Sequence, residues 1–278
     1  MIRGREGLAA KLSIDRCCQV LEVSRSFFYK KAEPVKQEPD ALEVVVLAFA
    51  EKHVAHGYRM ISARLQESGY ADATVKKVRR LMTKHGLKSR KRRSFVRTSI
   101  PGIGPVSPNL LKDAVLTGPK QALITDLTYV ATAQGFAYVA VILDAFTRRA
   151  LGYSVSRTMH TSLMLDALNN VAHNHRLPDG WIHHSDRGCQ YTSNEYRSAV
   201  LKLGGRLSNS AKGNPYDNAK MESFFKTYKY EEANLSDYQS VSEVREALRN
   251  FLHDYNYHRP HSSLNYKPPV AFEMANAA

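Results

Sequence analysis

The sequence predicts an α/β protein in which small all-α modules precede a mixed, five-stranded β-sheet with flanking helices. Residues 1–93 show only helical patterns, whereas residues 120–235 alternate between strand-like and helical patterns. Residues 94–119, between these two parts, are rich in Pro and Gly, which interrupt helices and strands alike. We therefore expect this stretch to be a linker and the main domain boundary.

The first helical module is expected within residues 1–36. Its pattern predicts a short helix, a turn in which Ser24 caps the next helix, and a second helix that carries Phe27 and Phe28. Such a pair either reads DNA as a helix-turn-helix or forms a helical hairpin around the two phenylalanines. The sequence leaves both interpretations open.

Residues 40–93 predict a second, helix-turn-helix-like module with a basic tail, built from helices over 41–53, 58–65 and 73–85. The apolar residues expected to face its core from the last helix are Val75, Val78, Leu81 and Met82. Basic residues occupy the other faces of that helix and continue beyond it, which favours contact with DNA phosphates over an ordinary solvated surface. The predicted DNA-binding side chains are Lys76, Lys77, Arg79, Arg80, Lys84, Lys88, Arg90, Lys91, Arg92 and Arg93.

The composition indicates a polyanionic partner. The 278 residues carry 40 basic and 26 acidic side chains, a net charge of +14 and a pI near 9.7, which is typical of proteins that bind nucleic acid. The sequence shows neither a long apolar run nor a secretory leader, so we expect no membrane role and a cytoplasmic location. Cys17, Cys18 and Cys189 lack both disulfide-framework and zinc-ligand spacing and are expected to be reduced.

The order of elements in residues 120–235 predicts how the sheet is built. Three strand-like runs follow one another through short connections, which predicts an antiparallel meander, and two short strands then alternate with helices. The expected strands are 122–131, 136–144, 150–156, 181–184 and 205–208, and the expected helices are 161–175, 194–203 and 217–231. Residues 236–278 are expected to add a helix over 241–255 and an irregular basic and aromatic tail that covers this domain.

Two acidic residues end strand-like runs, and a third lies on a helix. Asp126 ends the apolar part of the first run, and Asp186 stands 60 residues later at the end of the fourth. Glu222, which 35 residues separate from Asp186, lies on the last helix of this domain. Asn218 and Lys229 stand at helical spacing from Glu222, so we expect all three on one face.

These motifs resemble those of the transposase and retroviral-integrase superfamily, whose catalytic acids are Asp, Asp and Glu with about this last spacing, followed by a basic residue. The resemblance is closer still to insertion-sequence transposases translated from a second, overlapping reading frame. The motifs that carry it are Thr125–Tyr129, His184–Ser193, Lys212–Asn218, Glu222–Phe225 and Tyr255–Leu264. One departure is Leu123, where this family usually has Trp, and it concerns local packing rather than chemistry.

The resemblance implies a ribonuclease H-like catalytic core with Asp126, Asp186 and Glu222 as its catalytic residues. Three converging carboxylates repel one another unless cations neutralise them, and a ligand set made only of oxygen selects hard ions. We therefore expect Mg²⁺, with Mn²⁺ as a substitute, and the resemblance implies two ions bridged by Asp126. It also implies a polynucleotidyl transferase that nicks DNA at insertion-sequence ends and transfers the freed 3′-OH to a second strand.

By the same resemblance, Lys229, Asn218 and Gln190 are candidates to position the DNA backbone. The expected partners are the terminal inverted repeats of the element, target DNA, further copies of this chain on DNA, and the upstream-frame DNA-binding protein or a form fused to it. The implied location is the bacterial nucleoid. The alternatives are a ribonuclease H-like nuclease without strand transfer and a DNA-binding regulator with an inactive core, and the complete acidic triad argues against the regulator.

Overall fold

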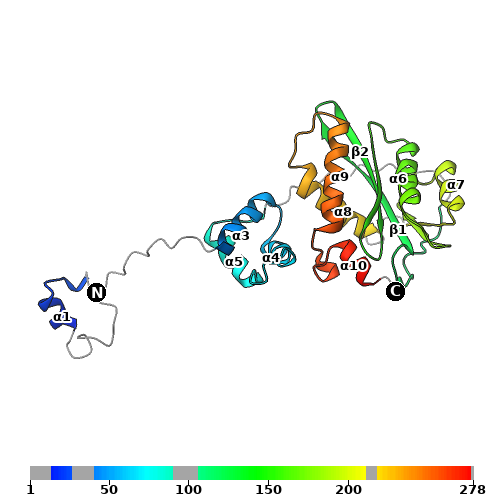
Figure 1. The fold of residues 1–278 in the computed structure, drawn as a ribbon. Coiled ribbons are helices and arrows are strands. Elements are labelled where there is room, and N and C mark those ends of the chain that lie inside the picture. The colour runs from blue at the N-terminus through cyan, green and yellow to red at the C-terminus, as the bar shows by residue number, and fades with distance from the viewer. Residues whose placement is uncertain (1–13, 27–40, 90–105, 211–217, 277–278) are drawn as a thin grey trace. The chain divides into compact units, whose positions relative to one another are not determined.

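The computed structural model describes residues 14–26, 41–89, 106–210 and 218–276 (Figure 1). The chain divides into two compact units, Met1–Ala41 and Leu42–Ala278. The first unit contains α1 (Ile14–Val20), on which Cys18 is buried. The helix predicted after Ser24 lies largely outside the described residues.

A module of three helices follows, with a core of its own. Its helices are α3 (Ala41–Lys52), α4 (Tyr58–Glu67) and α5 (Val75–Lys84). Their apolar faces meet so that Val46, Ile61, Leu65 and Val78 are fully buried. The side chain of Thr74 begins α5 by accepting a hydrogen bond from the backbone N–H of Lys77.

One residue predicted for this core is exposed. Val78, Leu81 and Met82 are buried as predicted, but Val75 is 44% exposed in the first turn of α5. Ala73, just before the capping residue, is fully buried. At the start of α5, Ala73 therefore contributes to the core, whereas the helical periodicity had predicted that Val75 would do so.

The second unit also contains a mixed sheet of five strands in the order β3-β2-β1-β4-β5. The first three strands form the predicted antiparallel meander, while β4 pairs in parallel with β1, and β5 pairs in parallel with β4. The strands are β1 (Ala122–Thr132), β2 (Gly135–Asp144), β3 (Ala150–Ser156), β4 (Ile182–Ser185) and β5 (Arg206–Asn209). This arrangement confirms the predicted fold class.

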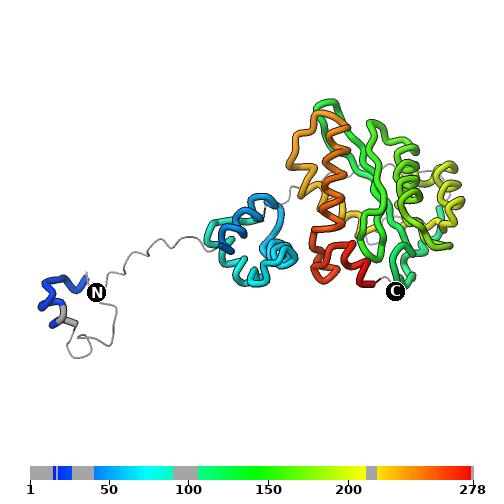
Figure 2. Tube along the Cα trace, in the orientation of Figure 1, coloured from blue at the N-terminus to red at the C-terminus, as the bar shows by residue number. Residues whose placement is uncertain are grey.

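Helices cover both faces of the sheet. α8 and α9 pack on one face, and α6 and α7 pack on the other, as Figure 1 and the tube in Figure 2 show. Side chains alternate along β1, so that Ala122 and Ile124 join the core under α8 and α9, while Leu123 is fully buried in the opposite core. The helices are α6 (Thr161–Asn174), α7 (Asn194–Lys202), α8 (Ala219–Tyr228) and α9 (Val241–Tyr257).

The helix that carries Glu222 is shorter than predicted. The expected span was 217–231, but α8 ends at Tyr228, and a turn of π-helix, Lys229–Ala233, continues it. Asn218 precedes α8 as its N-cap residue, yet its side chain makes no capping hydrogen bond. The start of α8 therefore makes no hydrogen bond with the Asn218 side chain.

The predicted irregular tail contains two further helices. A short 3₁₀-helix, Ser262–Leu264, is followed by α10 (Pro269–Ala275). Pro268 precedes α10 and Pro269 is its first residue. The pair suggested an irregular end, but Pro is well suited to the first position of a helix because its missing N–H would have no partner there. Of the helices that the structure describes, none has both the length and the apolar character needed to cross a lipid bilayer.

The end of the predicted linker packs against the sheet domain. The backbone N–H of Ser107 donates to the Asn209 side chain, and that of Leu110 donates to the Ser208 hydroxyl, both at 2.9 Å. Leu111 packs against the core under α8 and α9. The end of the linker, residues 107–111, is therefore docked on the sheet domain beside the outermost strand, β5.

Candidate active site

The ends of two neighbouring strands bring Asp126 and Asp186 together. β1 and β4 pair in parallel, with Ala122 opposite Ile182 and Ile124 opposite His184. Both pairs are separated by 60 residues, as are the two aspartates. Asp126 and Asp186 each follow the last of these pairs by two residues, so the register carries both toward the same edge of the sheet, with Asp186 just beyond the end of β4.

The same alternation decides which face of the sheet the aspartates occupy. Asp126 has the parity of Ile124, whose side chain packs in the core under α8 and α9. Glu222 stands on α8, which buries Met221 and Phe224 in that core. By this alternation, the Asp126 side chain is expected on the face of the sheet that α8, the helix of Glu222, covers.

Backbone amides hold one oxygen of each aspartate. The N–H of Leu127 donates to Oδ1 of Asp126 at 2.8 Å, and the N–H of Gly188 donates to Oδ1 of Asp186 at 2.9 Å. A Cβ atom at position 188 would lie 3.0 Å from Oδ1 of Asp186, which is a tight contact and explains why Gly188 occupies this position. The carboxylates are therefore oriented by the ends of their own strands.

Tyr191 lies beside both aspartates and was not predicted from the sequence as part of the site. Its pKa is raised first by burial, then by the charge of Asp126, with further contributions from Tyr196 and Asp186. Its hydroxyl lies 3.4 Å from the Thr125 hydroxyl. The ring packs in the core under α6 and α7, and only its place within the His184–Ser193 motif hinted at its proximity to the aspartates.

Asn209 at the end of β5 also supports the site and was missed. Its Nδ2 donates to the backbone oxygen of Asp186 and to the hydroxyl of Ser185, both at 3.1 Å. The neighbouring histidine is fixed in the same way, because His184 contacts the hydroxyls of Ser208 and Ser210 at 2.8 and 3.1 Å. Polar side chains on β5 thus tie down the segment that presents Asp186.

Glu222 does not form a cluster with the two aspartates. Its side chain is 35% exposed and lies 3.7 Å from the ammonium of Lys226, one turn further along α8. Within the described ranges, no three His, Cys, Asp or Glu side chains are close enough to hold one metal ion. In this structure Glu222 is therefore paired with Lys226 rather than gathered with Asp126 and Asp186.

The donor set fits a hard divalent cation. Two carboxylates on adjacent strand ends repel each other unless a cation lies between them, and carboxylate oxygen is the ligand that Mg²⁺ and Mn²⁺ prefer. Both carboxylates are held by short local hydrogen bonds. Asp126 and Asp186 are thus a preformed oxygen pair to which Glu222 can add a third carboxylate.

Lys229, predicted to contact DNA, is buried at the start of the π-helical turn. Its ammonium lies 4.6 Å from the centre of the Tyr129 ring, in a cation–π contact. Burial lowers the pKa of Lys229 to about 8. The side chain therefore titrates within the range in which enzymes of this kind can be assayed.

Gln190 and Asn218, the other two side chains predicted to position DNA, are also buried. Nε2 of Gln190 donates to the backbone oxygen of Met159 at 3.2 Å, so this amide braces the loop after Asp186. Oδ1 of Asn218 has no hydrogen-bond partner in the described part of the chain. Both residues lie close in sequence to the acids, but neither is on an open surface.

The basic residues predicted on α5 are exposed. Lys77 pairs with Asp72 at 3.4 Å, and Lys84 pairs with Glu43 at 2.7 Å, so part of this charge is neutralised within the module. Arg79 stacks over the ring of Tyr58. The exposed predicted residues are Lys76, Lys77, Arg79, Arg80, Lys84 and Lys88. Arg90, Lys91, Arg92 and Arg93 lie outside the described residues.

Comparison with known families gives separate matches for the helical module and for the sheet domain. A family model described as "Integrase core domain" matches residues 117–215, and a second with the same description matches residues 203–269. A model described as "HTH-like domain" matches residues 37–95. The integrase-core matches contain the three acids, and the HTH-like match contains α3, α4 and α5.

Known relatives align along nearly the whole chain. The chain is 34% identical to "Transposase InsF for insertion sequence IS3A" of Escherichia coli, over 97% of this chain and 96% of the relative. It is 34% identical to "Transposase for insertion sequence element IS904" of Lactococcus lactis, over 84% of this chain and 94% of that protein. An uncharacterized 31 kDa protein of insertion element IS600 from Shigella sonnei is 37% identical, over 92% and 96%.

Solved structures of viral integrases are more distant. A simian T-cell lymphotropic virus intasome matches with a TM-score of 0.47 at 15% identity, covering 76% of this chain and 74% of that chain. The catalytic core domain of BIV integrase matches with a TM-score of 0.43 at 13% identity, covering 57% and 96%. The identity to bacterial transposases, together with the integrase-core matches, decides the family. The chain belongs to the IS3-family insertion-sequence transposases, the second-frame type with an integrase core domain.

Proposed function

We propose that this transposase nicks DNA at the ends of its insertion sequence and joins the freed 3′-OH to target DNA. The observation that supports the proposal is the parallel pairing of β1 with β4, in which Asp126 and Asp186 each follow the Ile124–His184 pair by two residues, with Glu222 on the helix α8 that packs on the sheet. The terminal inverted repeats and target DNA are the substrates. Further copies of the chain and the upstream-frame protein are its proposed partners on the bacterial nucleoid.

In the joining step, the oxygen of the 3′-OH forms a bond to a target phosphorus while the bond to the target 3′-oxygen breaks. The hydroxyl proton leaves, the departing oxygen takes one up, and the number of phosphodiester bonds is unchanged. Asp126, Asp186 and Glu222 would hold Mg²⁺ or Mn²⁺, which stabilises the attacking and leaving oxygens. The N–H groups of Leu127 and Gly188 keep the two aspartate carboxylates in place.

Carboxylate-to-amide variants test the proposal. Asp126→Asn, Asp186→Asn and Glu222→Gln keep the shape of the side chain but remove its charge. Because metal-ion stabilisation contributes several kcal/mol, each should lower nicking and joining of labelled element-end DNA by at least about a hundredfold. DNA binding should persist. Asp166→Asn, on an exposed position of α6, is the matched control and should leave both reactions unchanged.

The products decide between the proposal and simple hydrolysis. Nicked and joined DNA resolve as separate bands, and the proposal requires both with the unaltered chain in Mg²⁺. Nicked products alone would show a nuclease without strand transfer. Normal turnover by any of the three amide variants would remove that residue from the site.

A further inference from the structure

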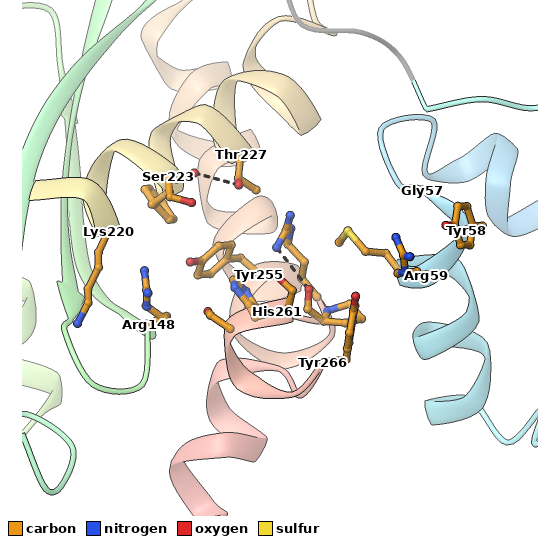
Figure 3. Close-up of a pocket in the computed structure, with 16 residues that line it drawn as sticks. Gly57, Tyr58, Arg59, Arg148, Lys220, Ser223, Thr227, Tyr255, His261 and Tyr266 are labelled. Atoms are coloured by element: carbon orange, nitrogen blue, oxygen red, sulfur yellow. Dashed lines mark hydrogen bonds between the residues drawn. The ribbon is translucent and has the colours of Figure 1, made fainter. Parts of the chain in front are cut away.

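A cavity of about 360 Å³ lies beside α8 (Figure 3), and its lining does not include Asp126, Asp186 or Glu222. Lys220, Ser223 and Thr227 line it at spacings of three and four residues, so they share one side of the helix. Glu222 is two positions from Lys220, about 200° further around α8. The helix α8 therefore carries Glu222 on one side and presents a separate row of side chains to this cavity.

The turn between β2 and β3 delivers Arg148 to the same cavity. Arg148 has a left-handed backbone with φ of 64°, which is unfavourable for any residue with a Cβ atom. Asp144 enforces the turn, because its carboxylate accepts hydrogen bonds from the N–H of Phe146 at 3.0 Å and the hydroxyl of Thr147 at 2.8 Å. The turn thus holds the Arg148 backbone in a strained conformation, which fixes the point from which its side chain extends into the cavity.

Two cations meet in the cavity without an acidic partner. Figure 3 shows Arg148 and Lys220 next to each other. Burial lowers the pKa of Lys220, and the charge of Arg148 lowers it further; burial also lowers the pKa of Arg148. Neither forms an ion pair with any residue that the structure describes, and Lys220 donates to the backbone oxygen of Ala145 at 2.7 Å. Asp144 is near Lys220, but its carboxylate accepts the hydrogen bonds of its own turn.

Arg149, next to Arg148 in the sequence, does have an acidic partner. Arg149 points elsewhere and pairs with Glu273 at 2.7 Å, and Lys120 pairs with the same carboxylate at 3.3 Å. The chain therefore supplies an acidic partner for the neighbouring arginine and none for Arg148. Two half-buried cations that form no ion pair with a described residue, and have one carboxylate, Asp144, nearby, carry excess positive charge that favours an anion.

His261 adds a buried polar atom without a partner. It lines the cavity from the C-terminal tail, is 8% exposed, and its Nε2 has no hydrogen bond in the described part of the chain. The ring is held edge-on to Tyr255 with centroids 4.5 Å apart. A buried polar atom of this kind is costly unless a ligand or water completes it.

We propose that this cavity is a second phosphate-binding site, which holds one backbone phosphate of DNA on the side of α8 away from Glu222. The phosphate supplies the negative charge that Arg148 and Lys220 lack and accepts charge-assisted hydrogen bonds from both. The hydroxyl of Ser223 is a further donor. The assignment of DNA as the source rests on the proposed function, whereas the affinity for phosphate rests on the cavity alone.

Binding of the full chain to a labelled DNA duplex, measured without divalent metal over a range of salt concentrations, tests this site. Arg148→Gln with Lys220→Gln should bind at least about tenfold more weakly than the control and lower the magnitude of the log–log salt slope by about 0.9, the loss of one phosphate contact. The control, Lys202→Gln with Arg249→Gln, removes the same charge at exposed positions. Equal slopes for the two double variants would overturn the proposal.

A second variant covers the case in which the first double variant fails to fold. Ser223→Asp places a carboxylate beside the two cations, so the fold gains an ion pair while phosphate is repelled. DNA binding should weaken about tenfold relative to Ser242→Asp, an exposed position on α9 that receives the same charge. Equal binding by the two serine variants would contradict the site.

Inorganic phosphate distinguishes the two sources of the anion. It should raise the Tm of the unaltered chain, compared with chloride at the same ionic strength, and should not raise that of Arg148→Gln with Lys220→Gln. A phosphate effect on Tm combined with equal DNA slopes would show a site for free phosphate and refute the DNA assignment. A slope difference in a chain that does not nick DNA would support this site and refute the proposed function instead.

Discussion

At the scale of residues, only a few hydrogen bonds are needed to orient the carboxylates of the candidate site. The parallel register sets the places of Asp126 and Asp186, and one backbone amide orients each carboxylate. Asn209 then holds the backbone at Asp186 from the next strand. A local hydrogen bond costs little entropy because its partners are already ordered, so this pair can be rigid before any cation or DNA arrives.

Lys229 carries a prediction about pH. Burial lowers its pKa to about 8, so the ammonium facing Tyr129 is charged below pH 8 and loses its proton as pH rises further. If the charge helps to hold DNA during joining, joining should decline above about pH 8. Lys229→Met, which keeps the length and apolar stem, should join less at pH 7 and lose this decline.

The control for that prediction is Lys202→Met at the end of α7, where the lysine is exposed. The pH profile of joining, normalised to nicking, should keep its alkaline decline in this variant. An unchanged decline in Lys229→Met would show that another group titrates. Lys229 would then be a packing residue for Tyr129.

At the scale of elements, periodicity and spacing predicted the five strands and the main helices, because each strand buries alternate side chains and each helix buries one stripe. The sequence did not predict the π-helical turn after Tyr228 or α10. Such helix ends depend on tertiary packing, and a Pro pair is compatible with a loop as well as with a helix start. Two acids of the site were predictable from strand ends, whereas Tyr191 and Asn209 act through contacts that only the folded sheet creates.

The π-helical turn is tied to the tail by a buried ion pair, which carries a prediction about stability. Arg259 donates two hydrogen bonds of 2.7 Å to Glu231, both side chains are 11% exposed, and His56 lies 3.2 Å from the same carboxylate. Glu231→Gln leaves the guanidinium buried without its counter-charge and should lower the free energy of unfolding by about 3–5 kcal/mol. Urea unfolding at pH 7 measures this loss. Glu246→Gln, in the exposed pair with Arg249, should change it by less than about 1 kcal/mol.

The same ion pair predicts how stability depends on acid. Burial alone would raise the pKa of Glu231, but the hydrogen bonds from Arg259 and His56 outweigh it and lower this pKa to about 2. Because the folded pKa is below the unfolded value, the contribution is present above about pH 4.5 and is lost as pH falls toward 2. The difference in stability between the unaltered chain and Glu231→Gln should therefore shrink across this window. A constant difference would refute the ionic origin of the stabilisation.

At the scale of the whole molecule, the net charge of +14 is distributed unequally between exposed and buried positions. The α3–α5 module presents its cations on the surface of α5, where only Lys77 and Lys84 have acidic partners among the described residues. The sheet domain instead concentrates Arg148 and Lys220 in one cavity. The module is therefore suited to many weak phosphate contacts along a duplex, and the cavity to one defined phosphate.

This division predicts how the full chain responds to charge removal in the module. Lys76→Gln, Arg80→Gln and Lys88→Gln together remove three exposed cations, and each lost phosphate contact should lower the magnitude of the salt slope of DNA binding by about 0.9. The matched control, Lys202→Gln, Arg249→Gln and Lys267→Gln, removes three exposed cations from the sheet domain and its tail and should change the slope much less. The effects of the module and of the Arg148–Lys220 cavity should add when combined, because the two groups share no partners. If the module variant and its control gave the same slope, the helical module would be structural, and DNA would be held by the sheet domain alone.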